Sequence, residues 1–318
     1  MTSDENAKSS STPRKYHDPV LTETIVDLLV TDRAALYVDG TTGGGGHAAA
    51  ISSRLSDGGQ ILCLDADDEA LAEADRRIGT RSGVAFRQTN FSDLKRAVEE
   101  FSSRKPHGIL LDLGVSSHQL DDARRGFTFR DDAPLDMRFD RRQTFSALDV
   151  VNGYNHETLS GVIHRYGEER AARSIARNIV SLRPVTTTRL LASAVEGAVG
   201  ARHLVKSLAR VFQAIRIEVN GELDALTKVL ADGIDILAPQ GRIAVIAYHS
   251  LEDRIVKTTF KSLAATSMRS TVKLVPDTIL TPTVRLVSRH AIVPDDEECR
   301  RNPRARSAKL RVAEKIGR

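Results

Sequence analysis

The sequence predicts an α/β fold in which a mainly parallel sheet is interrupted by a block of helices. Strand and helix candidates alternate up to about residue 113, residues 141–220 read as helices with no convincing strand, and the alternation then resumes. Each crossover between parallel strands needs a helix to cover the sheet, so this alternation predicts parallel strands. The helical block is therefore expected between the fourth and fifth strands of the sheet.

The first four strands are short apolar segments, and a helical stretch follows each of the first three. The predicted pairs are 35–39 with 47–55, 60–65 with 68–78, and 84–88 with 92–102, and the fourth strand is 108–113. In LYVDGTTGGGGHAAA, residues 36–50, the apolar start suits a buried strand and the alanines favour helix. A glycine-rich turn therefore joins the first strand to its helix.

The second half of the chain completes the sheet. Pro184 and Gly200 interrupt the helical block. The segment LDALTKVLADGIDILA (223–238) then predicts a helix, and GRIAVIAYHS (241–250) a buried strand. Near the end, TVRLVS (283–288) and AKLRVAEK (308–315) are expected to form a last pair of strands.

The composition is that of a globular protein of one or two domains. The chain has 318 residues, of which 41% are hydrophobic, and it contains no run of 18 apolar residues. The polar, Ser-rich residues 1–15 are expected to be a disordered tail, and they contain no apolar signal-peptide stretch. Two cysteines are too few for a disulfide framework or a Cys-based zinc site. We expect a cytoplasmic protein that does not contact membranes.

Positive charge gathers in two segments, although the formal net charge is only +4. Residues 161–217 contain ten Lys and Arg against three Glu, and residues from 300 onward are also mostly basic. In RAARSIARNIVSLR, residues 170–183, helical spacing separates Arg170, Arg173 and Arg177 from the apolar positions. This arginine row is expected to be exposed, facing either solvent or a polyanion such as RNA.

Four consecutive glycines, 43–46, point to a ligand that lies close to the backbone. A tight turn that needs positive φ explains one or two of them. Glycines between a first strand and its helix allow a ligand to approach the N–H groups at the helix start, where anionic groups are favoured. Gly44 to Ala49 also matches the G-x-G-x-x-A dinucleotide pattern, which is a weak signal by itself.

Neighbouring residues favour S-adenosylmethionine over a nicotinamide cofactor in this place. Asp65 ends the second strand about 20 residues after Gly45, where a carboxylate accepts hydrogen bonds from ribose hydroxyls. Asp39 ends the first strand, where it would repel a pyrophosphate but attract a cationic amino-acid group. Phe91 follows the third strand and is placed either to wall an adenine or to pack in the core.

The fourth strand leads into the segment GILLDLGVSSHQLDDARRGFTFRDDAPLDMRFD, which carries a family resemblance. The chain from Tyr16 to about Lys315 resembles the MraW or RsmH family of bacterial small-subunit ribosomal RNA cytosine-N4 methyltransferases. The matching segments are HDPVL at 17, VDGTTGGGGH at 38, LLDLGVSSHQLD at 110, RGFTFRDDAPLDMR at 125, YGEERAARSIARNI at 166, FQAIRIEVNGEL at 212, GRIAVIAYHSLEDRIVK at 241 and NPRARSAKLR at 302. Eight matches in the same order make the resemblance very specific.

The resemblance implies a class I S-adenosylmethionine-dependent methyltransferase, with a Rossmann-like sheet and an inserted helical domain. The methyltransferase domain would comprise 16–140 and 221–318, and the insert, 141–220, would bind RNA. The methyl acceptor would be the N4 amino group of a cytosine in the decoding centre (P site) of 16S ribosomal RNA, in the small ribosomal subunit. Carried over position by position, the cofactor-binding residues would be Gly45, Gly46, His47, Asp65, Phe91, Asp112 and Gln119. The resemblance leaves the oligomeric state open.

Four positions depart from the usual family pattern: Gly44, Ala66, His118 and Tyr248, the last standing where Phe is usual. His118 stands where Pro is usual, and it adjoins Gln119. This departure therefore affects the expected geometry of the loop after the fourth strand.

Methyl transfer to an amino nitrogen needs the nitrogen to be aligned with the donor's methyl group and sulfur. A hydrogen-bond acceptor that holds the amino hydrogens would orient the lone pair and stabilise the cationic nitrogen. Asp112, at the end of the fourth strand, is our candidate for this catalytic role. The loop lacks the aromatic of the Asp/Asn-Pro-Pro-Tyr/Phe tetrad of DNA amino methyltransferases. The candidates to clamp the base are therefore Phe127, Phe129, Phe139, Tyr248 and His249.

Other chemistries fit the residues less well. Ser116 and Ser117 lack the G-x-S-x-G context of a hydrolase nucleophile. The acidic and arginine residues of 124–140 favour ion pairs over a metal site. Two alternatives to the enzyme above stay open at this point: an RNA-binding ribosome assembly factor with a non-catalytic donor pocket, and an amino methyltransferase that acts on another nucleic acid.

Overall fold

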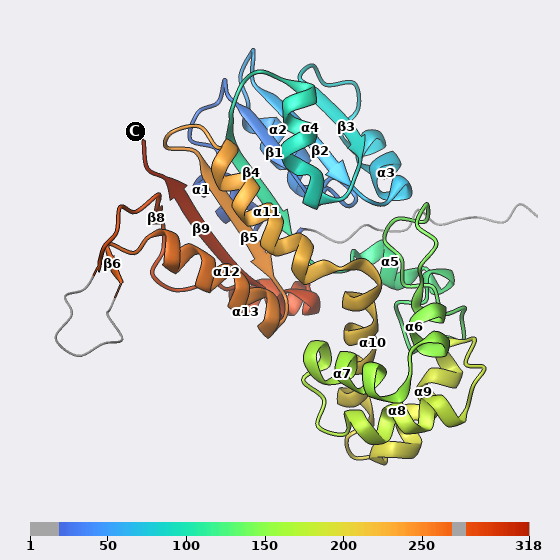
Figure 1. Ribbon diagram of the computed structural model, residues 1–318. Helices are drawn as coiled ribbons and strands as arrows, with labels where there is room; N and C mark the ends of the chain where they lie inside the picture. The colour runs from blue at the N-terminus through green and yellow to red at the C-terminus, as the bar shows by residue number, and fades with distance from the viewer. Residues whose placement is uncertain (1–18, 269–277, 318) are drawn as a thin grey trace, which may run out of the picture.

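The structure, a computed structural model, describes residues 19–268 and 278–317. The expectation of disorder for 1–15 concerns residues outside these ranges. Within them, no helix is both long enough and apolar enough to span a membrane. The chain forms a central sheet covered by helices, with a group of further helices at one end (Figure 1).

Among the described residues, the sheet has seven strands in the order β3-β2-β1-β4-β5-β9-β8. Their bounds are β1 (Leu36–Asp39), β2 (Gln60–Asp65), β3 (Val84–Gln88), β4 (Pro106–Asp112), β5 (Arg242–Ala247), β8 (Val284–Leu286) and β9 (Lys309–Lys315). Strands β1 to β5 pair in parallel, while β9 runs antiparallel to both β5 and β8. All predicted strands are confirmed, including the last pair.

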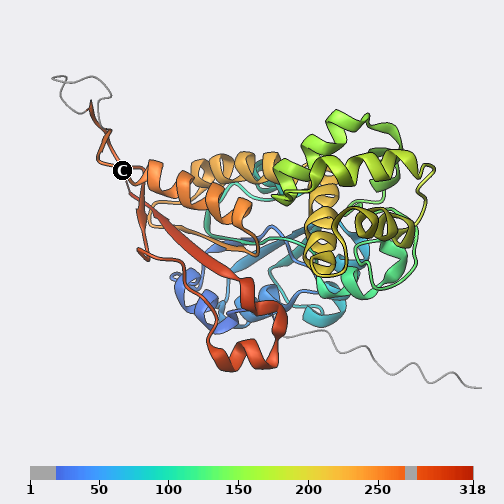
Figure 2. The same ribbon diagram turned by 90° about the horizontal axis from the view of Figure 1, so that it is seen from below.

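Helices cover both faces of this sheet (Figure 2). One layer contains α1 (Thr22–Leu29), α2 (Gly46–Arg54) and α3 (Asp68–Ile78), and the other contains α4 (Leu94–Phe101), α11 (Glu222–Ile236) and α12 (Ser250–Leu263). A separate hydrophobic cluster fills the space on each side of the sheet. Every residue of β1 is buried, as expected for a parallel strand that is covered on both faces. The sequence did not single out α1 or α12.

The group of helices follows β4 and ends before β5, as expected. It contains α5 (Ser117–Asp121), α6 (Ala147–Gly153), α7 (His156–Gly167), α8 (Ala172–Ser181), α9 (Thr188–Val199) and α10 (Leu204–Asn220). These helices have a third hydrophobic cluster, which includes Ile163, Ile175 and Ile215. The same cluster contains Phe127 and Met137, so the chain joins it well before residue 141.

Short elements complete the described chain. They are the 3₁₀ turns η1 (Phe91–Asp93), η2 (Ala123–Arg125) and η3 (Pro303–Ser307), the helix α13 (Asp296–Arg301), and the antiparallel pair β6 (Ser267–Met268) and β7 (Thr278–Ile279).

Three aspartates stand at the carboxyl ends of neighbouring strands. Asp39 ends β1, Asp65 ends β2 and Asp112 ends β4. Because these strands are parallel and adjacent, their ends meet along one edge of the sheet. The helices α5 to α10 lie beyond this edge (Figure 1). Open α/β sheets bind their ligands at this edge, so the fold directs the search for a site to the space between the sheet and the inserted helices.

Candidate active site

A cavity of about 470 Å³ lies at this edge of the sheet. One part of its wall comes from the loops after β1, β2 and β3, including Gly43, Asp65 and Phe91. Another part comes from the end of β5 and from the region where α10 meets α11, including Tyr248 and Arg216. Since β4 lies between β1 and β5 in the sheet, the loop after β4 joins the two halves of the cavity.

The glycine loop is built by backbone conformation and by close packing. Gly43 and Gly45 have φ values of +50° and +77°, which side chains disfavour. A Cβ on Gly45 would lie 2.8 Å from the backbone of Ala74 in α3, and one on Gly46 would lie 2.8 Å from Pro19. Gly46 lines the cavity, as do 43 and 44, whereas Gly45 does not. Turn geometry and helix packing therefore account for more of the glycines than the sequence argument allowed.

Asp65 links the end of β2 to the glycine loop. One carboxylate oxygen accepts a hydrogen bond from the N–H of Gly43 at 2.7 Å, and the other accepts from the N–H of Asp67 at 2.9 Å. Burial raises the pKa of Asp65 to about 6, although these hydrogen bonds act in the opposite direction. Phe91, in η1, is partly buried against the core and also lines the cavity. Both predicted contacts therefore stand on the same wall.

Asp39 lies beneath the wall of the cavity. Its side chain is 1% exposed and does not line the cavity. Its Oδ1 accepts a hydrogen bond from the N–H of Thr41 at 3.2 Å, while Oδ2 has no hydrogen-bond partner among the described residues. Burial, together with the charges of Asp112 and Asp65, raises the pKa of Asp39 to about 8. A pKa of about 8 leaves Asp39 mainly protonated at neutral pH, and a positively charged ligand close to it would favour its ionised form.

Asp112 stands where the two halves of the cavity meet. The hydroxyl of Tyr248 donates a hydrogen bond to its Oδ1 at 2.9 Å, and Nδ1 of His47 lies 3.5 Å from its Oδ2. The N–H of Asp112 donates to the hydroxyl of Thr41 at 2.6 Å. Its carboxylate is 24% exposed, and this part faces the cavity. Burial raises the pKa of Asp112, and the charge of His47 and the Tyr248 hydrogen bond oppose the effect.

His47, in the first turn of α2, connects the glycine loop to Asp112. Its Nε2 lies 2.9 Å from the carbonyl oxygen of Val20. Since a carbonyl only accepts, Nε2 donates this hydrogen bond. The Nδ1 atom then faces the Asp112 carboxylate, and the ring is buried while it also contributes to the cavity wall.

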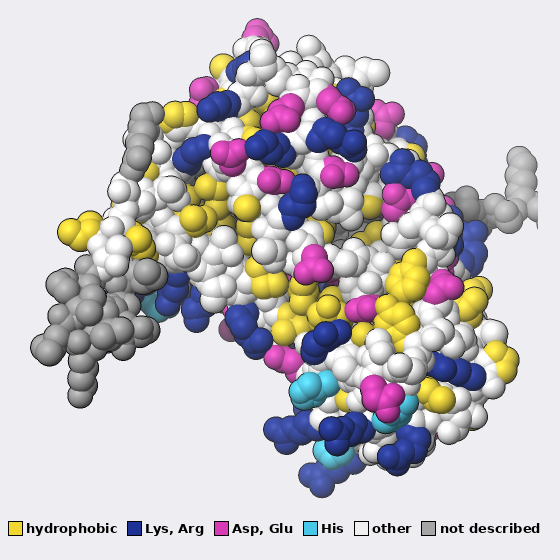
Figure 3. All heavy atoms as spheres, viewed as in Figure 1, with side chains coloured by type: hydrophobic (Ala, Val, Ile, Leu, Met, Phe, Trp, Pro, Cys, Tyr) yellow, Lys and Arg dark blue, Asp and Glu magenta, His cyan; other side chains and the backbone are white. Residues whose placement is uncertain are grey.

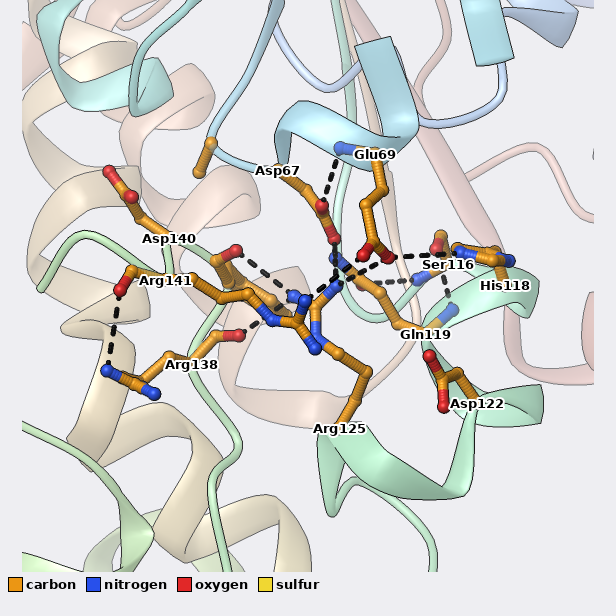
Figure 4. A network of polar contacts seen from close by, with 12 residues as sticks. Asp67, Glu69, Ser116, His118, Gln119, Asp122, Arg125, Arg138, Asp140 and Arg141 are labelled. Carbon is orange, nitrogen blue, oxygen red and sulfur yellow. Dashed lines mark hydrogen bonds and ion pairs between the residues drawn. The ribbon is translucent and has the colours of Figure 1, made fainter. Parts of the chain in front are cut away.

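Gln119 belongs to a buried polar network that ties α3 to the loop after β4 (Figure 4). Its Nε2 donates to Oδ2 of Asp67 at 2.8 Å, and its Oε1 accepts from the N–H of Ser116 at 3.0 Å. The Ser116 side chain in turn accepts from the N–H of Gln119, which completes a capping box on α5. Gln119 therefore holds the loop in place, and it also reaches the cavity wall. His118 lies beside Glu69, with 3.5 Å between Nε2 and Oε2.

Arg125 completes the same network from η2. Its Nη1 donates to Oδ2 of Asp67 at 2.6 Å, and its Nη2 donates to the carbonyl oxygens of Arg138 and Phe139 at 3.0 and 3.2 Å. Asp67 also caps α3 by accepting from the N–H of Glu69. Arg125 was expected to pair with the aspartates between 131 and 140, but its partner is Asp67, to which the sequence analysis assigned no role. The segment 65–67, DAD, at the end of β2 signals a helix N-cap at Asp67. No local pattern, however, shows that Arg125 is the partner of Asp67.

The second half of the cavity has a wall of buried charged residues that sequence reasoning also missed. Arg216 of α10 binds Glu222 of α11 through two hydrogen bonds of 2.8 and 2.9 Å. Burial raises the pKa of Glu222, and the charge of Arg216 opposes the rise. Both residues occur in FQAIRIEVNGEL, where they are six positions apart at a helix junction. Their pairing depends on the turn at Gly221, which has a φ of +58°.

His249 and Glu252 extend this charged wall at the start of α12. The N–H of Glu252 donates to Nδ1 of His249 at 3.4 Å, and Oε2 of Glu252 accepts from the N–H groups of Tyr248 and His249. This reciprocal cap gives His249 a structural role. Burial tends to raise the pKa of Glu252, but the hydrogen bond and charge of His249 outweigh burial and lower it.

The candidate base-stacking residues separate into two groups. Phe139, Tyr248 and His249 line the cavity. Phe127 and Phe129 do not: the ring of Phe127 stacks against Phe139 with 5.5 Å between centroids, and Phe129 packs edge-on against Phe212. The segment between η2 and α6 therefore brings Phe139 to the wall and supports it with the ring of Phe127.

The acidic residues between 131 and 140 pair mainly with arginines, as expected. Asp136 binds Arg138 at 2.7 Å, Asp140 binds Arg142 at 2.7 Å, and Asp132 approaches Arg189 at 3.5 Å. Arg142 and Arg189 lie outside the segment 124–140 in which we expected the partners. Across residues 19–268 and 278–317, no three His, Cys, Asp or Glu residues are grouped as metal ligands.

The strand order, with antiparallel β9 beside β5, and the cavity at the carboxyl ends of β1, β2 and β4 define a class I methyltransferase that uses S-adenosylmethionine. Comparisons with known proteins narrow this class. The profile of the MraW methylase family matches residues 14–316. The chain therefore belongs to the MraW methylase family.

Curated relatives match the chain over nearly its full length. The chain is 44% identical over 321 residues to "Ribosomal RNA small subunit methyltransferase H" of Chlorobium luteolum, covering 96% of this chain and 98% of the relative. The protein of the same name from Dehalococcoides mccartyi strain 195 is 46% identical over 302 residues, covering 94% and 86%. Solved structures are more remote: a putative rRNA methylase from Clostridium thermocellum has a TM-score of 0.43 and 10% identity, covering 93% and 95%.

The residues of the first half of the cavity fit the donor. A carboxylate at the end of β2 and an aromatic after β3 suit a ligand with ribose hydroxyls and a flat base, and the buried Asp39, whose Oδ2 has no hydrogen-bond partner among the described residues, lies behind this wall. When bound, S-adenosylmethionine supplies a methyl group attached to a positively charged sulfur. After the transfer, the rest of the donor leaves as a neutral thioether.

Proposed function

We propose that this protein methylates the N4 amino group of a cytosine in the decoding centre of 16S ribosomal RNA, in the cytoplasm. The continuous cavity carries this proposal, because its wall combines the strand-end residues of the sheet with Arg216 and Phe139 from beyond β4. A protein that bound only the methyl donor would need the strand-end residues but not Arg216 and Phe139. The names of the full-length relatives support ribosomal RNA of the small subunit as the substrate.

The donor is proposed to bind in the half of the cavity near β1, β2 and β3. Asp65 would accept hydrogen bonds from the ribose hydroxyls, and Phe91 would contact the adenine. Gly46 and His47, at the start of α2, would pack against the amino-acid part of the donor. Gly45 and Gln119 would act indirectly: Gly45 permits the turn and the contact with α3, and Gln119 holds the loop that carries Asp112.

The acceptor base is proposed to enter the half lined by Phe139, Arg216 and Tyr248. The ring of Phe139, supported by Phe127, would stack on the base. Asp112 would accept a hydrogen bond from the amino group, which directs the nitrogen lone pair toward the methyl carbon and stabilises the developing positive charge. The position of β4 between the two halves supports this role.

The RNA backbone is proposed to lie across the inserted helices, residues 141–220. Basic side chains gather at the lower end of the molecule, over α7 and α8 (Figure 3). Arg173 and Arg177 are exposed on α8, and Arg170 is exposed in the turn just before it. By contrast, several basic residues after 300 form internal contacts, for example Arg311 with Asp253 at 2.7 Å. The insert therefore offers the more available positive surface for phosphates.

Mass spectrometry of ribosomal RNA tests the proposal. RNA from cells that lack the protein should lose one N4-methylated cytosine, and purified protein with labelled S-adenosylmethionine should restore it on unmethylated small subunits. Tight binding to these subunits without methyl transfer would favour the RNA-binding assembly factor. Transfer to adenine, or to DNA in competition, would contradict the proposed acceptor.

A further inference from the structure

Tyr248 brings a hydroxyl group to Asp112 from the neighbouring strand. In the β4–β5 register, Asp112 lies opposite Ile246, and Tyr248 follows two residues later just after the strand ends. The Tyr248 hydroxyl donates to Oδ1 of Asp112 at 2.9 Å. Gly114, with a φ of +96°, lies under the ring, because a Cβ there would stand 3.7 Å from a ring carbon. The loop after β4 thus accommodates an aromatic ring that it does not itself supply.

The hydroxyl restricts the orientation of the carboxylate. Tyr248 occupies Oδ1, and Nδ1 of His47 faces Oδ2 at 3.5 Å. The hydrogen bond from Tyr248 therefore fixes the position of Oδ1, and His47 adds an ion pair at Oδ2 when its ring is protonated. A phenylalanine at this position would leave Oδ1 without this donor. The arrangement therefore depends on the tyrosine hydroxyl.

We propose that Tyr248 is a positioning residue, whose hydroxyl orients the Asp112 carboxylate toward the amino group of the acceptor base and keeps it in its accepting form. This inference rests on the proposed function. Tyr248 acts through Asp112. Removal of the Tyr248 hydroxyl should therefore change how the rate depends on the protonation state of the Asp112 carboxylate.

The surroundings of Asp112 predict the direction of the effect. His47 of α2 and Tyr248 favour the ionised carboxylate, whereas burial, Glu252 of α12 and Asp39 of β1 oppose it. The phenol of Tyr248 donates one hydrogen bond to the ionised carboxylate, which lowers its pKa. Without this hydrogen bond, less remains to counter the rise in pKa that burial causes. The pKa of Asp112 should then rise, and the acidic limb of the pH–rate profile should move upward with it.

The test compares Tyr248→Phe with the wild-type protein, using the full chain. Tyr154→Phe is the matched control, because the Tyr154 hydroxyl donates to the carboxylate of Glu218 at 2.7 Å and Tyr154 does not line the cavity. The first readout is a carboxyl ¹³C NMR titration without donor, in which the Asp112 signal is assigned by its loss in Asp112→Asn. The second is the single-turnover rate of methyl transfer to unmethylated small subunits between pH 5 and 9.

In Tyr248→Phe, both the NMR midpoint and the acidic limb should move to higher pH by about one unit, and the rate above the limb should also fall, because the ionised carboxylate is no longer held toward the amino group. Tyr154→Phe should move neither. An unmoved NMR midpoint, or an equal loss of rate at every pH, would overturn the inference. If the wild-type protein does not methylate cytosine, the proposed function fails, and the inference that rests on it fails too. If the wild type does methylate cytosine but its pH–rate profile coincides with that of Tyr248→Phe, only the inference is overturned.

Discussion

Arg125 and Asp67 form an ion pair with 2.6 Å between Nη1 and Oδ2, and their side chains are 0% and 1% exposed. The pair joins η2, which follows β4, to the N-cap residue of α3 (Figure 4). The same arginine holds the carbonyl oxygen of Phe139, and Asp67 lies two residues after Asp65. One buried contact therefore connects the proposed donor wall to the proposed base-stacking ring.

Arg125→Met should destabilise the protein by about 3–5 kcal/mol, because it leaves the Asp67 carboxylate buried without its partner. Chemical denaturation measures the change. Arg130→Met is the control, since this arginine of the same segment is exposed and should hardly move the midpoint. Adding Asp67→Asn to Arg125→Met should recover part of the loss, because Asn removes the unpaired charge and still caps α3. Additive losses would contradict this explanation.

Donor affinity should fall below about pH 6. Ionised Asp65 is the form that accepts hydrogen bonds from ribose hydroxyls, and its pKa is raised to about 6. Calorimetry with S-adenosylhomocysteine between pH 5 and 8 should show a loss approaching tenfold per pH unit at the acidic end. The Asp65→Asn variant should bind S-adenosylhomocysteine weakly, and its affinity should depend less on pH. If its affinity changes with pH as steeply as that of the wild type, Asp65 does not contact the ribose.

The stability contribution of Asp65 should change with pH in the opposite direction. Its folded-state pKa, about 6, exceeds the ordinary value of 3.8, so the folded protein binds this proton more tightly than the unfolded chain does. The contribution is fully present below about pH 4 and is lost as the pH rises through 6. In donor-free protein, Asp65→Asn should therefore gain stability relative to wild type as the pH rises from 5 to 7.

Phe139→Leu should reduce methyl transfer by about tenfold or more while leaving donor affinity within twofold. Loss of base stacking typically costs about 1–3 kcal/mol, and Phe139 lies outside the proposed donor wall. Phe129→Leu is the control, because Phe129 packs against Phe212 and does not line the cavity. Equal rates in the two variants would show that Phe139 does not hold the base.

Replacing Arg170, Arg173 and Arg177 together with Gln should flatten the salt dependence of RNA affinity, by roughly 0.7–0.9 in the log–log slope for each lost phosphate contact. Filter binding between 50 and 300 mM salt measures the slope. A charge-matched control replaces Arg54, Arg76 and Arg96, which form ion pairs with acidic residues elsewhere. If both triple variants lose the same slope, the arginines act only through net charge.

The order of the elements was readable from the sequence because it depends on local patterns. Residues 68–78 and 84–88 have the predicted bounds, and the helices between β4 and β5 were expected from the break in alternation. The strand-end positions of Asp65 and Asp112 follow from the same periodicity. The missed helix α12 begins at Ser250, directly after the strong β5 signal, where a reciprocal cap and not an apolar run marks the start.

The individual contacts of the site depended on tertiary structure. The sequence determined a parallel sheet with a glycine loop, carboxylates at three strand ends and a basic helical insert, since each is encoded within a short window. Only the fold decided that Asp39 lies beneath the wall, that Gly45 packs on Ala74, and that Tyr248 reaches Asp112. The last pair is separated by 136 positions, and such contacts arise from strand order and side-chain packing, which no local pattern specifies.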